Sequence, residues 1–229
     1  GKAYEFKGDP AFDNDKIGIA VRKDDPLTAK LNDALKAIVD DAHMYGLKVA
    51  AHAHGANGIK DAIRAGVDTI EHASLIDDEG IELARKYGAY LSMDIYNTEY
   101  TQSEGKKNGV LEDNMRKDRE VADAQREGFR KAHKAGVKMV YGTDAGVHPN
   151  GENGKQFRWM VKYGMTPAQA IQSATAISAE ALGRKDIGLL EAGRFADIIA
   201  VKGDPSQDVT LLENVDFVMK GGEVYKGGN

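Results

Sequence analysis

The sequence contains no cysteine among its 229 residues. This absence excludes disulfide bonds, a catalytic thiolate and zinc sites built from thiolates, although it says nothing about the compartment in which the protein works. Any metal ion that the protein binds must therefore be held by histidine, aspartate and glutamate side chains.

Several other classes of function also lack their usual signals. The net charge of −5 gives no electrostatic reason to expect nucleic acid or an anionic membrane as a partner. No apolar run approaches the length of a membrane span and no signal-peptide pattern opens the sequence, so we expect a cytoplasmic protein if the chain is expressed as it stands. Glycine-rich phosphate loops and dinucleotide fingerprints are missing too, so nothing in the sequence points to a bound nucleotide.

What the sequence does contain is a pattern that occurs four times. A glycine ends a helix, a short apolar strand follows, and the strand finishes on a histidine or an aspartate. The four copies are residues 46–52, 66–72, 88–94 and 136–144, with the polar residue six positions after the glycine in the first three and eight in the last. Because parallel α/β folds place their active sites at the carboxyl ends of the strands, we expect these polar side chains to share one surface.

Segments with the apolar spacing of helices separate these strands and are followed by glycine. They cover residues 27–42, 59–65, 77–87, 111–135 and 166–182. After Gly183 the spacing changes to two, which predicts strands at 196–201, 215–219 and 223–225 with a Gly221-Gly222 turn between the last two. Two further short strands are predicted at 4–7 and 17–23. The predicted fold is α/β, with a parallel sheet of about five or six strands.

The residue types at the strand ends point to metal-dependent hydrolysis. His52, His72 and Asp144 each end a different strand, and two imidazoles with one carboxylate are a usual ligand set for zinc. Asp144 could also accept a proton from the attacking water and pass it to a leaving amine. The alternative is that these residues are polar strand ends bonded to loop backbone.

Four more residues are candidates for binding the substrate. His54 shares a strand face with His52, so it could touch a substrate, support the site or be a structural histidine. Tyr96 and Asn97 follow the third strand at the rim of the expected pocket, together with Asp94, and could instead order their loop. His148, in the loop after Asp144, could also reach the pocket.

Four segments resemble motifs of the amidohydrolase superfamily: VAAHAHG at 49–55, TIEH at 69–72, MDIYN at 93–97 and GTDAG at 142–146. The similarity is greatest to the imidazolonepropionase-like branch, which includes Xaa-Pro dipeptidase-type and ochratoxin-hydrolysing enzymes. The resemblance implies strands five to eight of a (β/α)8 barrel over residues 39–185 and a small β-sandwich over 186–229. It also implies hydrolysis of C–N bonds, with His52 and His72 as metal ligands and Asp144 as ligand and general base.

Residues 1–38 resemble a different family. Their strand, the run GIAVRKDD and the helix LNDAL are similar to the closing part of a periplasmic amino-acid-binding protein. The His-x-His pair and the carbamylated lysine that the amidohydrolase resemblance implies in the first half of the barrel have no counterpart upstream of His52. We therefore expect a chimera or a rearranged natural fragment.

The incomplete ligand set leads to two hypotheses about function. The first is a hydrolase of amide or dipeptide-like substrates whose activity is impaired. The second is a non-catalytic chain that binds at most one metal ion weakly. Because half a barrel leaves strand edges unpaired, we also expect a homo-oligomer or a complementary half barrel as partner.

Overall fold

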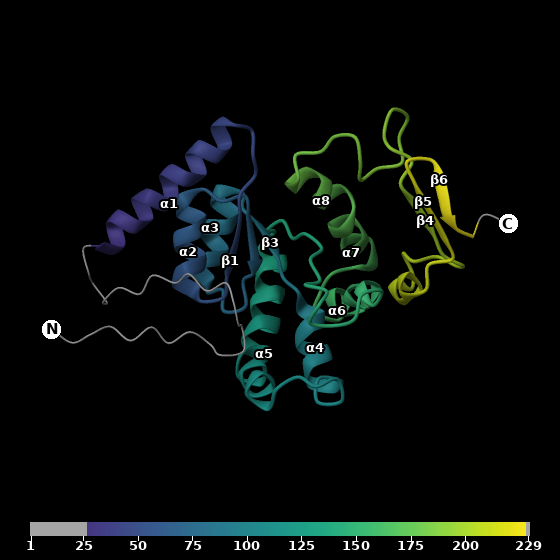
Figure 1. Ribbon diagram of the computed structural model, residues 1–229, viewed down its shortest axis with the longest axis horizontal. Coiled ribbons are helices and arrows are strands. Elements are labelled where there is room, and N and C mark those ends of the chain that lie inside the picture. Colours follow the sequence, from purple (N-terminus) through teal and green to yellow (C-terminus); the bar gives the residue numbers. More distant parts are fainter. Residues whose placement is uncertain (1–26, 228–229) are drawn as a thin grey trace.

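The computed structural model describes residues 27–227, which form the α/β arrangement drawn in Figure 1. The strands predicted at 4–7 and 17–23 lie outside these residues. The first half of the described chain contains α1 (Leu27–Met44), β1 (Ala50–Ala53), α2 (Ala56–Ala65), β2 (Thr69–His72), α3 (Asp78–Tyr87), β3 (Tyr90–Ser92) and α4 (Ile95–Ser103). The second half contains α5 (Glu112–Lys134), α6 (Gln156–Lys162), α7 (Pro167–Ala174), α8 (Ala176–Ala181), β4 (Ile198–Ala200), β5 (Phe217–Lys220) and β6 (Glu223–Lys226), with short 3₁₀ helices at Asn153–Lys155 and Val209–Glu213.

The parallel sheet has the order β1-β2-β3, and each crossover between its strands is a helix. Ala50 pairs with Thr69, and Thr69 pairs with Tyr90, so the strands are in register and their carboxyl ends lie at one edge. Gly66 and Gly88 end α2 and α3 in the left-handed conformation, with φ of 97° and 74°. A residue with a Cβ would be strained there, which explains why these glycines marked the helix ends in the sequence.

The strand predicted at 137–144 forms only a fragment of the sheet. Within residues 27–227, Met139 makes an isolated parallel bridge to Leu91, with Val140 N–H donating to the Leu91 carbonyl at 2.9 Å. The next N–H, that of Tyr141, donates instead to the Ser173 carbonyl at 3.2 Å. The ladder stops because the backbone turns toward the end of α7. The expectation of five or six parallel strands was therefore wrong for the described residues, where the parallel sheet has three strands.

The helix α4 is a second difference from the expectation, since residues after Asp94 were predicted to form a rim. Its buried positions include Ile95 and Tyr96 but also Asn97, Thr98 and Thr101, so no separate apolar stripe announces a helix in the sequence. The long helix α5 packs beside α4 (Figure 1), with Phe129 fully buried against the core. The helical conformation of α4 is therefore explained by its packing against α5 rather than by a local apolar pattern.

The core lies between the parallel sheet and the helices that pack against it. Its fully buried side chains include Ile59 and Ile63 of α2, Ile70 of β2, Leu91 of β3 and Met160 of α6. Burying a side chain of this size stabilises the fold by about 1.5–3 kcal/mol. The core thus fixes the strands whose carboxyl ends carry the polar residues.

The helix predicted at 166–182 is two helices. Thr175 has φ of −123° and ψ of −94°, outside helical values, and this residue separates α7 from α8. The start at Thr166 was predicted correctly, since Thr166 and Gln169 form a reciprocal capping box.

The three strands predicted after Gly183 are confirmed. They form an antiparallel sheet of order β4-β5-β6 in which Gly221 and Gly222 make the turn between β5 and β6. This sheet lies apart from the parallel one in Figure 1. No helix among residues 27–227 is long and apolar enough to cross a membrane.

Candidate active site

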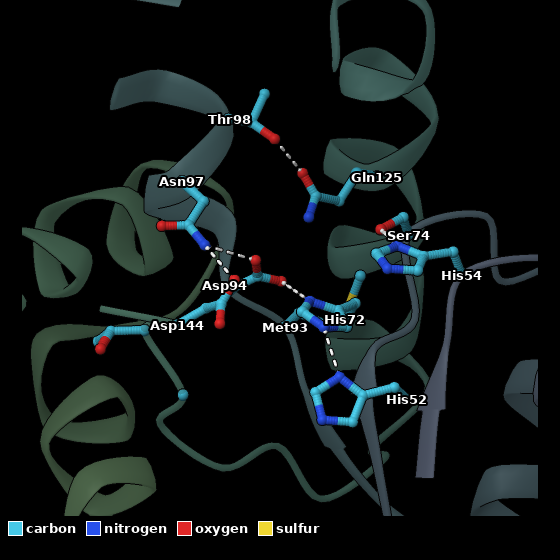
Figure 2. A network of polar contacts seen from close by, with 12 residues as sticks. His52, His54, His72, Ser74, Met93, Asp94, Asn97, Thr98, Gln125 and Asp144 are labelled. Carbon is cyan, nitrogen blue, oxygen red and sulfur yellow. Dashed lines mark hydrogen bonds and ion pairs between the residues drawn. The ribbon is translucent and has the colours of Figure 1, made fainter. Parts of the chain in front are cut away.

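The carboxyl edge of the parallel sheet gathers the polar residues that the sequence pattern selected (Figure 2). His52 lies in β1, His72 is the last residue of β2, and Asp94 precedes α4 directly after β3. Asp144 follows the bridged segment at Met139. The prediction of a shared surface is correct in its geometry, because these four residues come from neighbouring segments of one edge.

His72 is the centre of this group. Its Nε2 lies 2.9 Å from Nδ1 of His52, and its Nδ1 lies 3.1 Å from Oδ1 of Asp94. The backbone of His72 has φ of 71° and that of Asp144 has φ of 48°, which non-glycine residues rarely adopt. Such strained positions persist where the surrounding structure enforces them, and they cluster at functional sites.

His72 and Asp94 stabilise each other's charged forms. The hydrogen bond from His72 to Asp94, together with the charge of that carboxylate, raises the pKa of His72 despite its partial burial. Burial raises the pKa of Asp94, but the hydrogen bonds from His72 and Asn97 outweigh it, so the pKa of this carboxyl lies below its usual range. Asp94 is therefore a carboxylate at neutral pH.

Asn97 connects the two aspartates. Its Nδ2 donates to Oδ2 of Asp94 at 2.8 Å and to Oδ2 of Asp144 at 3.2 Å. Because one amide serves both carboxylates, Asp94 and Asp144 are held side by side.

The residues present fit a divalent metal ion. One ligand atom from each of His72, Asp94 and Asp144 lies within 4.8 Å of the other two, so among the described residues this group contains Asp94 and does not include the predicted ligand His52. The nitrogens of His52 and His72 that face each other are 2.9 Å apart, whereas two nitrogens bound to one zinc ion lie about 3.3 Å apart, given bonds of about 2.0–2.1 Å and tetrahedral angles. A small opening of this pair would therefore admit zinc.

His54 packs on the same group. Its ring stacks on that of His72 with centroids 4.4 Å apart and an interplanar angle of 14°, and its Nδ1 lies 3.0 Å from Oγ of Ser74. The side chain is exposed at the sheet edge, as is that of His52.

Tyr96 and His148 lie behind this edge and are buried. The Tyr96 hydroxyl donates to Oε2 of Glu152 at 2.7 Å, and its ring centroid is 4.7 Å from that of His148. His148 is 1% exposed, with its ring nitrogens 3.0 Å from the Thr143 carbonyl and 3.1 Å from the Pro149 carbonyl. Both residues, predicted to bind substrate, already have protein partners here, and their role remains a prediction.

Sequence reasoning placed Asp94 only at the rim and did not select Gln156. Asp94 carried a signal, because it stands at the same position of the repeated pattern as His52 and His72. Gln156, at the start of α6, accepts a hydrogen bond from Tyr96 N–H at 3.0 Å and donates to the carbonyls of Met93 and Gly142. Nothing in the sequence marks it, since it joins segments about 60 residues apart.

The profile of the amidohydrolase family matches residues 15–226. The chain belongs to the amidohydrolase family. The match includes residues 15–38, which lie in the segment predicted to derive from a binding protein, and the second resemblance and the chimera remain predictions.

Individual relatives agree with this assignment. The amidohydrolase is 34% identical over 218 residues to ochratoxinase of Aspergillus niger, covering 92% of this chain and 45% of that one. A crystal structure of a Xaa-Pro dipeptidase with bound methionine in the active site is 43% identical with a TM-score of 0.80, covering 86% of this chain and 49% of the other. A prolidase complexed with N-methylphosphonate-L-proline is 28% identical with a TM-score of 0.78, covering 85% and 49%. The chain thus spans about half the length of the relatives it matches.

Proposed function

We propose that this amidohydrolase is a metal-dependent hydrolase of C–N bonds in amides or dipeptide-like molecules, with zinc as its metal. The observation that carries the proposal is the position of His72, which lies between His52 and Asp94 with the carboxylate of Asp144 close by. We propose further that the parallel sheet and the segment at Met139 correspond to strands five to eight of a (β/α)8 barrel.

In this proposal His52, His72 and Asp144 hold the metal, which when bound supplies a Lewis acid that polarises the scissile carbonyl. Asp94 is not a ligand in this proposal, because its two oxygens already accept from His72 and Asn97. Asp144 also acts as the general base. Its side chain is exposed at the sheet edge, so it can accept a proton from the attacking water and deliver it to the leaving nitrogen. His54, also exposed, contacts the substrate beside His72.

Because the site is exposed, we propose that catalysis needs a second protein segment that covers it. His52 and Asp144 face solvent, where water screens the charges that would stabilise a transition state. β1 lies at the edge of the parallel sheet, and the preceding segment exposes Ile38, Tyr45 and Leu47 by 62%, 82% and 60%. We propose that another half barrel covers this edge and supplies the remaining ligands, and that this chain alone has impaired activity.

Light scattering on the purified chain tests the simplest form of this partnership, a dimer of two copies. A dimer that dissociates when Tyr45 and Leu47 are replaced by serine would support the proposal. A monomer at high concentration would refute self-association. The covering half barrel would then have to come from a different chain.

The catalytic proposal is tested by loading the chain with zinc, measuring the metal content and following hydrolysis of acyl-amino acids and dipeptides. Asp144→Asn keeps the shape of the side chain but cannot accept the proton, so we expect turnover to fall about 10²–10⁴-fold. The matched control is Asp123→Asn on α5, because the Asp123 side chain is 98% exposed, pairs with Arg126 and is not among the residues proposed to bind the metal or the substrate.

Turnover that survives Asp144→Asn would refute the proposed base. Zinc bound in stoichiometric amount without turnover on any of these substrates would instead favour the non-catalytic, metal-binding alternative.

A further inference from the structure

His72 uses both ring nitrogens, in opposite directions (Figure 2). The partner of Nδ1 is a carboxylate oxygen of Asp94, which can only accept a hydrogen bond. The hydrogen of the neutral ring must therefore sit on Nδ1. This leaves the lone pair on Nε2, the nitrogen that faces His52 at 2.9 Å.

Both oxygens of Asp94 are occupied in turn. Oδ1 accepts from His72 and Oδ2 accepts from Nδ2 of Asn97, so the carboxylate is fixed in position from two sides. Asp94 is 8% exposed and Asn97 is 7% exposed. A carboxylate committed in this way is suited to orienting the histidine that it contacts, as carboxylates behind metal-binding histidines commonly do.

The orientation of the Asn97 amide follows from its neighbours. Turning the amide over would place its oxygen against two carboxylates, so the nitrogen must face Asp94 and Asp144. The amide oxygen, Oδ1, is then buried without a hydrogen-bond partner among the described residues. An unpaired buried oxygen lowers stability, which indicates that this amide is kept for its effect on the two carboxylates.

The helix that carries Asn97 is itself held on both sides of that residue. Tyr96 N–H donates to Oε1 of Gln156 at 3.0 Å, and Thr98 Oγ1 donates to Oε1 of Gln125 at 2.6 Å. These two ties connect the first turn of α4 to α6 and α5. The backbone of Asn97 is therefore held in place, so its amide can fix the positions of both aspartates.

We infer that Asp94 and Asn97 are positioning residues: Asp94 holds the His72 ring with its hydrogen on Nδ1, and Asn97 fixes Asp94 beside Asp144. The inference rests on the proposed function, because the free lone pair on Nε2 of His72 is the one that would bind the metal. The placement of the hydrogens, however, depends only on the contacts around His72 and can be measured without any metal.

One consequence concerns His52. If Nε2 of His72 carries no hydrogen, Nδ1 of His52 must donate the hydrogen that the two nitrogens share at 2.9 Å. A metal held by His52 Nδ1 and His72 Nε2 would require the hydrogen of the His52 ring to sit on Nε2 instead, while the hydrogen on His72 Nδ1 would stay with Asp94.

The test is long-range ¹H–¹⁵N NMR of the metal-free, ¹⁵N-histidine-labelled chain at alkaline pH, where the neutral rings report their tautomers. The chain has six histidines, and the spectrum of His72→Gln identifies the signals of His72. We expect a hydrogen on Nδ1 of His72 in the metal-free chain, and still on Nδ1 after zinc is added. A hydrogen on Nε2 in the metal-free chain, or its loss from Nδ1 on zinc binding, would overturn the inference.

Two variants extend the test. We expect Asp94→Asn and Asn97→Ala to shift the His72 ¹⁵N signals and to weaken zinc binding about 10–100-fold, measured by competition with a chelator. The matched control is Asn108→Ala, which removes an exposed amide whose side-chain hydrogen bond within residues 27–227 goes to the Glu104 carbonyl. Variants with parental His72 signals and parental zinc affinity would overturn the inference.

The outcomes separate this inference from the proposed function. A parent chain that binds no zinc would refute the function while the metal-free tautomer still decides the positioning. If a variant fails to fold, the measurement on the parent chain alone remains decisive.

Discussion

Replacing Gly142 by alanine should disturb the approach of Asp144 to the site. The backbone at Gly142 runs so close to β3 that an added Cβ would clash with Oγ of Ser92 and lie 3.4 Å from the Ser92 Cβ. Gly142 does not have a positive φ, so alanine meets no backbone strain there. The cost of the substitution is therefore the cost of this one contact.

The magnitude depends on what Ser92 can do. Either its hydroxyl must rotate away from the added Cβ or the backbone must shift, whereas the Ser92 Cβ at 3.4 Å is in ordinary van der Waals contact and needs no adjustment. Overpacking of this kind costs about 1–3 kcal/mol. In a Ser92→Ala background the hydroxyl is gone, and we expect the cost of Gly142→Ala to fall by about 1 kcal/mol or more.

Urea denaturation of the four proteins in this double-mutant cycle measures the coupling between the two positions. Gly58→Ala is the control, because a Cβ at Gly58, inside α2, would meet nothing within 4 Å. We expect this control to be stabilised by up to about 1 kcal/mol, since alanine is the better helix former. The reasoning fails if Gly142→Ala costs nothing, or costs the same with and without the Ser92 hydroxyl.

Two other substitutions test the supports of the sheet and of α7. Burial raises the pKa of Asp68, but hydrogen bonds from Lys48 Nζ and Val49 N–H outweigh it, so the pKa of this carboxyl is lowered in the folded state. A lowered folded pKa stabilises the protein above the unfolded value of about 4 and loses that contribution as the pH falls further, so Asp68→Asn should cost about 1–2 kcal/mol at neutral pH and progressively less in acid. Urea midpoints measured across pH would contradict this if the difference did not shrink. Thr166→Ala removes the acceptor for Gln169 N–H and should cost about 1 kcal/mol, whereas an unchanged unfolding midpoint would show that the capping box contributes nothing.

The sequence was most informative where one residue type is required by local geometry. Gly66 and Gly88 marked helix ends because only glycine adopts their left-handed backbone without strain. The repeated spacing from glycine to His52, His72 or Asp94 located the edge of the sheet, because a strand of fixed length carries its last residue to a fixed place.

The sequence misled where packing between distant segments decides the structure. The strand expected at 137–144 is reduced to a bridge at Met139 because Tyr141 finds its partner on α7. The helix α4 was missed because its polar residues are buried among other helices, which no local pattern reveals.

The sequence by itself therefore determined that histidines and aspartates end successive strands, and its motifs at 49–55, 69–72, 93–97 and 142–146 carried the resemblance to the amidohydrolase family. Only the tertiary structure decided that Asp94 bonds to Nδ1 of His72, and that Asn97 lies between Asp94 and Asp144. The physical reason is that strand periodicity fixes where a side chain starts and which face it leaves from. Which atoms then meet depends on rotamers and on helices that come from elsewhere in the chain.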